Sequence, residues 1–184
     1  MHRIMLVDDE PNILNALRRT LGTKITDGQD TFPVTVETFE QPELALQRAQ
    51  DVKVDVVMSD YRMPGMDGVT FLKAFRELQP NAMRLILSGY ADLSALIGAI
   101  NEAQIYRFIS KPWHDYEVIT NIVQALALQN ALQENQRLAD QVRAQRGRLS
   151  RQEMELRRIE AETPGITRVR WGPDGSVLLD DEDL

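Results

Sequence analysis

The feature that most constrains the fold of this chain is the alternation of five short apolar runs with longer segments of helical periodicity. The apolar runs are IMLV from Ile4, VTVETF from Val34, VDVVMS from Val54, MRLILS from Met83 and IYRFI from Ile105. Short runs of this kind are typical of strands that are covered on both faces. The segments between and after them predict helices over residues 11–21, 42–50, 68–78, 93–103 and from 115 onward. Five such units in succession predict an α/β fold with a doubly wound, five-stranded parallel sheet.

Composition excludes several classes of function. The 184 residues are 43% hydrophobic, which is enough for one domain with a core and a smaller appendage. A formal charge of −7 argues against a nucleic-acid partner, and the absence of cysteine excludes a thiolate metal site. The apolar start is too short for a signal peptide, and no run approaches the roughly 20 residues of a membrane span. We therefore expect a cytoplasmic protein that binds neither membranes nor nucleic acid.

Polar side chains follow four of the predicted strands at the point where each strand ends. Asp8 and Asp9 end the first strand, Asp60 the third and Ser88 the fourth, and Lys111 follows the fifth. The carboxyl ends of parallel strands meet at one edge of a sheet, so these groups should lie close together. Three carboxylates that lie together repel unless a cation such as Mg²⁺ joins them. A nearby lysine and hydroxyl then suit the oxygens of a phosphoryl group.

Each of these residues also has an ordinary structural interpretation when it is considered alone. Asp9 could cap the following helix, and Asp60 and Ser88 could open turns. Lys111 could be one more solvated cation. The functional interpretation is favoured because compatible groups arrive at the same end of four strands.

The segments VDD, DYRMPGMDG, LSG and KPW, in this order, closely resemble the receiver domain of two-component response regulators. The resemblance covers about residues 3–127 and implies the flavodoxin-like strand order 2-1-3-4-5. It also implies that Asp60 accepts a phosphoryl group from a phosphohistidine of a sensor histidine kinase. The string IYRFISKPW is most similar to receivers linked to cyclic-dinucleotide phosphodiesterase-type outputs.

The resemblance assigns a Mg²⁺ site to four residues. Asp9, Asp60 and the backbone carbonyl of Arg62 would hold the ion, and Asp8 would reach it mainly through water. Arg62 has a second implied role, because its side chain and that of Tyr90 could shield the phosphoryl group from attack by water. Simple surface exposure is the alternative for both side chains.

The resemblance assigns phosphoryl binding and switching to a second group of residues. Lys111 would pair with the phosphoryl oxygens, and Ser88 with the adjoining Gly89 would sense the arrival of the group. Phe108 occupies the position of the family's switch aromatic, and Tyr106 is expected on the same strand face. The Lys111–Pro112 peptide bond is one that is often cis in this family.

The remaining third of the chain predicts one long helix to about Glu160 with a coiled-coil seam. The seam combines Leu128, Asn135, Val142, Leu149 and Leu156 with Ala131, Leu138, Gln145, Gln152 and Ile159. We expect a parallel homodimer through this seam, with Asn135 fixing its register. A solvated single helix and an antiparallel hairpin bent at Gly147 remain the alternatives.

These features divide the chain into three parts. Residues 1–127 form the expected receiver, residues 128–162 the coiled-coil extension, and residues 163–184 a β-hairpin with an acidic tail. The expected protein is no enzyme beyond its own phosphorylation and dephosphorylation, and it signals by binding a downstream protein whose identity the sequence does not give. The alternatives are a fragment or relative of a regulator with an enzymatic output domain, and a phosphate sink or relay.

Overall fold

The computed structural model of this protein describes residues 1–26, 28, 31–89 and 103–162, and the side chains of all of these except 148–150 and 160–162. The chain divides into two compact units, Met1–Gln133 and Glu134–Leu184. The hairpin expected over residues 163–184 and most of the helix expected over residues 93–103 lie outside the described residues. No helix in the described part of the chain is long and apolar enough to cross a membrane.

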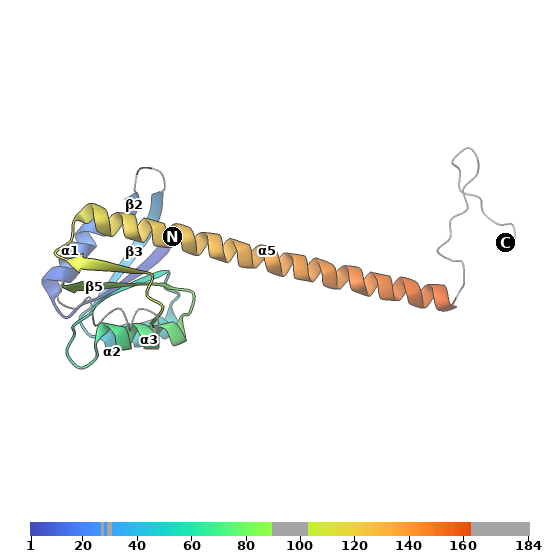
Figure 1. The fold of residues 1–184 in the computed structure, drawn as a ribbon, viewed down its shortest axis with the longest axis horizontal. Coiled ribbons are helices and arrows are strands. Elements are labelled where there is room, and N and C mark those ends of the chain that lie inside the picture. Colours follow the sequence, from blue (N-terminus) through green and yellow to red (C-terminus); the bar gives the residue numbers. More distant parts are fainter. Residues whose placement is uncertain (27, 29–30, 90–102, 163–184) are drawn as a thin grey trace. The chain divides into compact units, whose positions relative to one another are not determined.

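The first unit is built on a six-stranded sheet. Its strands are β1 (His2–Val7), β2 (Lys24–Thr26), β3 (Thr31–Phe39), β4 (Val56–Asp60), β5 (Met83–Gly89) and β6 (Arg107–Lys111). They lie in the order β2-β3-β1-β4-β5-β6 (Figure 1). All pairings are parallel except that of β2 with β3. The expected count of five strands is therefore wrong by one, while the five expected strands are adjacent in the expected order.

The additional strand β2 forms a hairpin with β3 at the edge of the sheet. Ile25 pairs antiparallel with Phe32, and Ile25 is buried while its neighbours in β2 are exposed. A three-residue strand with one apolar side chain gives no period-two pattern, so the sequence could not reveal it. Edge strands of this length are common at sheet borders, where they limit pairing with other chains.

Two strand boundaries differ from the expectation in a way that matters for the site. The strand expected from Ile105 begins at Arg107 and ends at Lys111, so Lys111 belongs to β6 and does not follow it. The strand expected from Val54 begins at Val56 and ends on Asp60. Both functional side chains are thereby held by ladder hydrogen bonds of the sheet, and not by a loop.

Helices cover both faces of the sheet and divide the core into two clusters. The helices are α1 (Pro11–Leu21), α2 (Pro42–Asp51), α3 (Gly68–Leu78) and α5 (Asp115–Glu162). In β1, Ile4 and Leu6 pack with residues of α1 and α5, whereas Met5 and Val7 pack with residues of α2 and α3. Alternate residues of a strand point to opposite faces, so one apolar run supplies both clusters. Each fully buried aliphatic or aromatic side chain contributes roughly 1.5–3 kcal/mol to stability.

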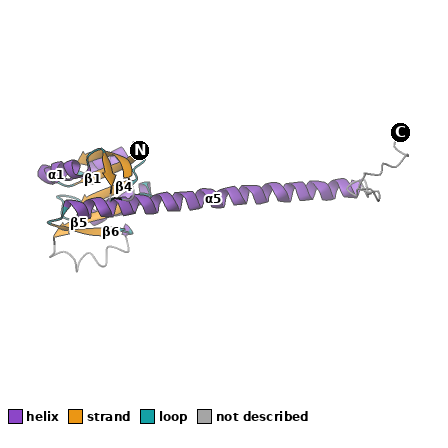
Figure 2. Cartoon of the chain, turned by 90° about the horizontal axis from the view of Figure 1, so that it is seen from above, coloured by secondary structure: helices purple, strands orange, loops and turns teal. Residues whose placement is uncertain are grey.

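Helix α5 is continuous from Asp115 to Glu162 (Figure 2). Val118, Ile122 and Leu126 are buried in the core of the first unit. In the second unit, residues 134–147 and 151–158 are all exposed. The expected helix therefore exists over its whole length.

Candidate functional site

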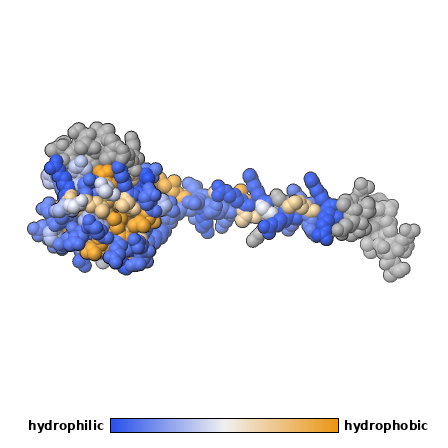
Figure 3. All heavy atoms as spheres, turned by 90° about the horizontal axis from the view of Figure 1, so that it is seen from below, coloured by the Kyte–Doolittle hydropathy of each residue, from blue (hydrophilic) through white to orange (hydrophobic). Residues whose placement is uncertain are grey.

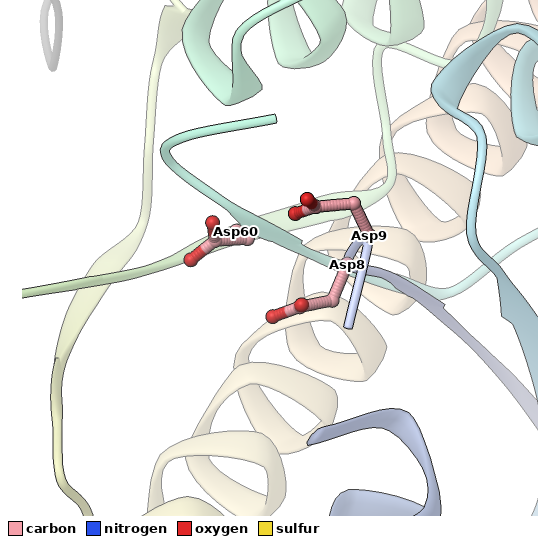
Figure 4. Close-up of side chains that lie close together, drawn as sticks. All are labelled: Asp8, Asp9 and Asp60. Atoms are coloured by element: carbon pink, nitrogen blue, oxygen red, sulfur yellow. The ribbon is translucent and has the colours of Figure 1, made fainter. Parts of the chain in front are cut away.

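The candidate site lies at the carboxyl ends of the central strands. Asp8 and Asp9 directly follow β1, and Asp60 is the last residue of the neighbouring strand β4. One carboxylate oxygen from each of these three residues lies within 4.8 Å of the others. Figure 4 shows the three side chains projecting to the same side of the strands. Asp8 and Asp60 are buried and Asp9 is exposed, so the cluster lies at the border between core and solvent.

Lys111 of β6 completes this cluster. Its Nζ lies 2.6 Å from Oδ1 of Asp60 and 2.8 Å from Oδ2 of Asp8. The lysine side chain is 20% exposed, and the side chains of Asp8 and Asp60 are 1% and 9% exposed. An ammonium that is shared by two nearly buried carboxylates compensates much of the cost of burying them.

Backbone amides hold the second oxygen of each buried carboxylate. The amide of Glu10 donates to Oδ1 of Asp8 at 2.9 Å, and the amide of Arg62 donates to Oδ2 of Asp60 at 3.0 Å. Both are bonds from residue i+2 to an aspartate that ends a strand, a geometry that short carboxylate side chains readily adopt. Each carboxylate is therefore fixed at both of its oxygens.

Burial and charge act in opposite directions on the protonation of this cluster. Burial raises the pKa of the Asp8 carboxyl above its ordinary value, although hydrogen bonds from Lys111 and from the Glu10 amide oppose this. Burial also acts to lower the pKa of Lys111, but its bonds to Asp60 and Asp8 outweigh burial, and the pKa of Lys111 is raised. Lys111 therefore stays charged, and the cluster lacks positive charge for its three carboxylates.

This set of donors fits a hard divalent cation. Carboxylate oxygens from three residues meet within reach of one ion, and one of the carboxylates is exposed to solvent that can supply further ligands. The expected grouping of Asp8, Asp9 and Asp60 is thus brought together by the fold.

The turn between Asp60 and α3 depends on a glycine that the sequence did not single out. A Cβ atom at Gly68 would collide with the backbone carbonyl oxygen of Asp60. The Gly68 amide donates to the carbonyl of Tyr61 at 2.9 Å, and Asp67 caps α3 by accepting from the Thr70 amide at 2.8 Å. The only available signal was the second glycine of PGMDG, at the first position of the expected helix.

Ser88 and Gly89 lie beside the acidic cluster. Asp60 pairs with Leu87 in the register of β4 and β5, and Gly89 pairs with Lys111 in the register of β5 and β6. Ser88 is buried, and its Oγ lies 3.4 Å from the Gly89 carbonyl. The sheet therefore places the serine between the strands that carry Asp60 and Lys111.

The aromatic residues before Lys111 are arranged differently from the expectation. Phe108 packs against the cluster covered by α2 and α3, whereas Tyr106 packs against the cluster covered by α1 and α5. The expectation that they share a face is wrong, because Tyr106 precedes β6 and is outside its strict alternation. Arg62 is exposed, and Tyr90 lies outside the described residues. The Lys111–Pro112 peptide bond is cis, as the resemblance implied.

Comparison with known proteins gives one family and a set of relatives. The family model of the response regulator receiver domain matches residues 4–124. A hydrogenase transcriptional regulatory protein, HoxA of Cupriavidus necator, is 38% identical over 126 residues, which are 68% of this chain and 24% of that regulator. The chain spans about a quarter of the length of the curated relatives that it matches.

Two solved structures show the same architecture. The receiver domain of an HD domain-containing protein from Pseudomonas fluorescens Pf-5 has a TM-score of 0.63 at 35% identity, covering 71% of this chain and 98% of that one. An adenylate cyclase structure from Rhodopirellula baltica has a TM-score of 0.65 at 33% identity, covering 76% of this chain and 97% of that one.

Proposed function

Because the chain belongs to the response regulator receiver family, we propose that it accepts a phosphoryl group on Asp60 from a phosphohistidine of a sensor histidine kinase. The observation that carries this proposal is the position of Lys111, whose ammonium lies 2.6 Å from the Asp60 carboxylate and also contacts Asp8. A carboxylate that is buried beside a fixed cation at the carboxyl end of a strand is placed to receive an anionic group.

In the proposed reaction, a carboxylate oxygen of Asp60 attacks the phosphorus of the phosphohistidine. An O–P bond forms and the P–N bond breaks, and the electron pair leaves with the imidazole ring, whose nitrogen then takes a proton. The amide of Arg62 holds the carboxylate in place through Oδ2. Reactions of this class depend mainly on positioning and on neutralisation of charge.

Asp8, Asp9 and Asp60, together with the backbone carbonyl of Arg62, would hold Mg²⁺ in this proposal. When bound, the ion would supply the positive charge that lets an anionic phosphoryl group approach an anionic carboxylate. The clustering of the three carboxylates supports this assignment.

The proposed signalling step uses residues on both sides of the acceptor. Lys111 moves from the carboxylates to the oxygens of the new phosphoryl group, and Ser88 with Gly89 responds to it at the end of β5. Phe108, half-buried on β6, changes its packing as these residues shift. In this proposal Arg62, which is exposed, and Tyr90 shield the acyl phosphate from water.

The output of the proposed function is binding of a downstream protein, and the chain acts on no substrate other than its own phosphoryl group. The similar proteins named above comprise a transcription regulator, an HD domain-containing protein and an adenylate cyclase. One receiver fold thus accompanies different outputs, and the receiver alone does not fix which output applies.

A second candidate function follows from the length of HoxA, of which the matched segment is 24%. In this candidate the chain is the receiver part of a regulator, and phosphorylation controls an output domain rather than a separate protein. The two candidates differ in the partner that responds to Asp60. Binding of an isolated output domain that rises with beryllium fluoride, a mimic of the acyl phosphate, would favour the second candidate.

The test of the proposed function is phosphorylation of the purified chain. Incubation with acetyl phosphate and Mg²⁺, followed by intact mass spectrometry, should show the gain of one phosphoryl group, and chelation of Mg²⁺ should abolish it. Asp60→Asn should show no gain, whereas the control Asp67→Asn, which alters an exposed carboxylate of the same turn, should phosphorylate normally. A gain at the wild-type rate in Asp60→Asn would disprove the assignment.

A further inference from the structure

The part of α5 beyond the core exposes a row of apolar side chains. Leu128, Leu138, Val142 and Leu156 are 40%, 46%, 47% and 53% exposed. Figure 3 shows pale and orange side chains interrupting the hydrophilic surface along this helix. Exposed leucine and valine at heptad spacing, on a helix with little other packing, indicate a face that a partner covers.

This row is distinct from the face by which α5 packs on the sheet. The packed face follows Val118, Ile122, Ala125 and Gln129, which are all buried and are spaced by three or four residues. Continued with the same alternation of four and three, this face passes through Leu132, Gln136, Ala139 and Arg143, which are all exposed, so the packing ends at Gln129. The exposed apolar row begins at Leu128, on another side of the helix. It is therefore not a prolongation of the core face.

Charged side chains flank the apolar row without entering it. Glu134 pairs with Arg137 at 2.9 Å, and Asp140 pairs with Arg143 at 2.9 Å. These partners are three residues apart on one helix, so their charges are balanced within the chain. The ten heptad positions of the seam from Leu128 to Ile159 contain no charged residue. The row is thus a charge-free strip about 48 Å long, at 1.5 Å per residue.

We propose that this strip binds the same strip of a second copy of the chain, in parallel orientation and in register. This inference does not depend on phosphorylation of Asp60. A second copy is the occupant that matches the strip over its whole length. It places leucine against leucine and Asn135 against the partner's Asn135, an arrangement that specifies two strands and one register.

Charge and size at the flanking positions favour the parallel orientation. In a parallel pair, Leu132, which is 56% exposed, lies against Ala127 of the partner. The heptad likewise places position 148, an arginine, opposite Glu153 of the partner. In an antiparallel pair with full overlap, Glu134 would face Glu155 of the partner, and Leu132 would face Glu153. The parallel pair also brings like charges together, at Glu155 and Glu160 of the partner, but only the antiparallel pair leaves the exposed leucine without an apolar neighbour.

Cross-linking tests the orientation directly, because the chain contains no cysteine. A disulfide needs Cα atoms about 4.4–6.8 Å apart. In a parallel, in-register pair, a seam residue lies this close to the same residue of the partner. In an antiparallel pair with full overlap, Leu138 would instead lie against Leu149 of the partner. Leu138→Cys should therefore form a cross-linked dimer on mild oxidation. Met154→Cys, at an exposed outward position of the same helix, is the matched control and should not. If Leu138→Cys alone gives no cross-link, and a cross-link forms only when Leu138→Cys and Leu149→Cys are mixed, the parallel orientation is overturned.

Sedimentation of the 184-residue chain tests the association itself. The wild type should be dimeric at tens of micromolar, with or without beryllium fluoride and Mg²⁺. Leu138→Glu should raise the dimer dissociation constant by about 100-fold, because it places two like charges at the seam. Met154→Glu carries the same charge on the outward side and should sediment as the wild type does. A wild-type chain that is monomeric in both conditions would overturn the proposal.

Discussion

Lys111 contacts the carboxylate to which the proposed phosphoryl group would be attached. Its ammonium is shared between Asp8 and Asp60, so it stabilises two carboxylates that also accept hydrogen bonds from backbone amides. The same contact makes the lysine a competitor of an incoming cation, since both neutralise the same oxygens. Removing Lys111 should therefore affect stability and metal binding in opposite directions.

We predict that Lys111→Ala lowers the free energy of unfolding by roughly 1–3 kcal/mol in the absence of Mg²⁺, because two buried carboxylates lose their cation. Mg²⁺ affinity should be retained or raised. Urea unfolding with and without Mg²⁺ measures the first effect. Titration followed by Trp113 fluorescence, in a Trp171→Phe background, measures the second. Lys53→Ala, an exposed lysine, is the control, and a large loss of Mg²⁺ affinity in Lys111→Ala would contradict the role.

Gly68 sets the position of Asp60 from outside the acidic cluster. We predict that Gly68→Ala destabilises the protein by about 1–3 kcal/mol, since the new methyl group forces the Asp60 carbonyl to move. Displacement of the acceptor should slow phosphoryl uptake by up to about 100-fold. Mass spectrometry after timed incubation with acetyl phosphate measures the rate.

The matched control for that substitution is Gly147→Ala, because nothing lies within 4 Å of a Cβ atom placed at this exposed helical glycine. It should gain about 1 kcal/mol of helix stability and leave phosphorylation unchanged. Equal stability and equal rate in Gly68→Ala and the wild type would show that the turn adapts to the methyl group.

At the scale of elements, the apolar runs predicted the five parallel strands, because buried strands in such a sheet have a strong compositional signature. The signature missed only β2 among the described strands, and it gives no account of the one charged residue inside β5. β2 has a single buried residue, Ile25, and β5 contains Arg84 within its apolar run. The buried Arg84 guanidinium donates to the carbonyls of Pro80, Ala82 and Ala103. Pro80 and Ala82 lie four and two residues before Arg84, whereas Ala103 lies 19 residues after it, and no periodic pattern in the sequence reveals such acceptors.

The acidic cluster could be predicted because strand ends are readable from the sequence, and parallel strands bring their ends together. Three other features could not be predicted: the bridging contact of Lys111, the hydrogen bonds from backbone amides to the second oxygen of each buried carboxylate, and the close approach of Gly68 to Asp60. These depend on side-chain reach and on turn geometry, which a sequence pattern does not encode. The different faces of Tyr106 and Phe108 illustrate the same limit, since alternation holds only inside a strand.

At the scale of the whole molecule, the proposed phosphorylation and the proposed self-association use different residues. The acidic cluster and Lys111 belong to Met1–Gln133, whereas most of the seam belongs to Glu134–Leu184. We predict that Leu138→Glu gains the phosphoryl group at the wild-type rate although it is monomeric. Asp60→Asn should remain dimeric although it gains no phosphoryl group. Mass spectrometry and sedimentation of the same samples check both, and a loss of phosphorylation in monomeric Leu138→Glu would show that the units are coupled.

The bridging position of Lys111 also has a consequence for which ions the protein can discriminate. Three carboxylates and one ammonium give the cluster a net charge of two negative units when all are ionised. A monovalent ion leaves a surplus of negative charge, and a trivalent ion reverses its sign. Only a divalent ion would cancel it, so in the proposed site the charge of Lys111 would turn a general attraction for cations into a preference by valence.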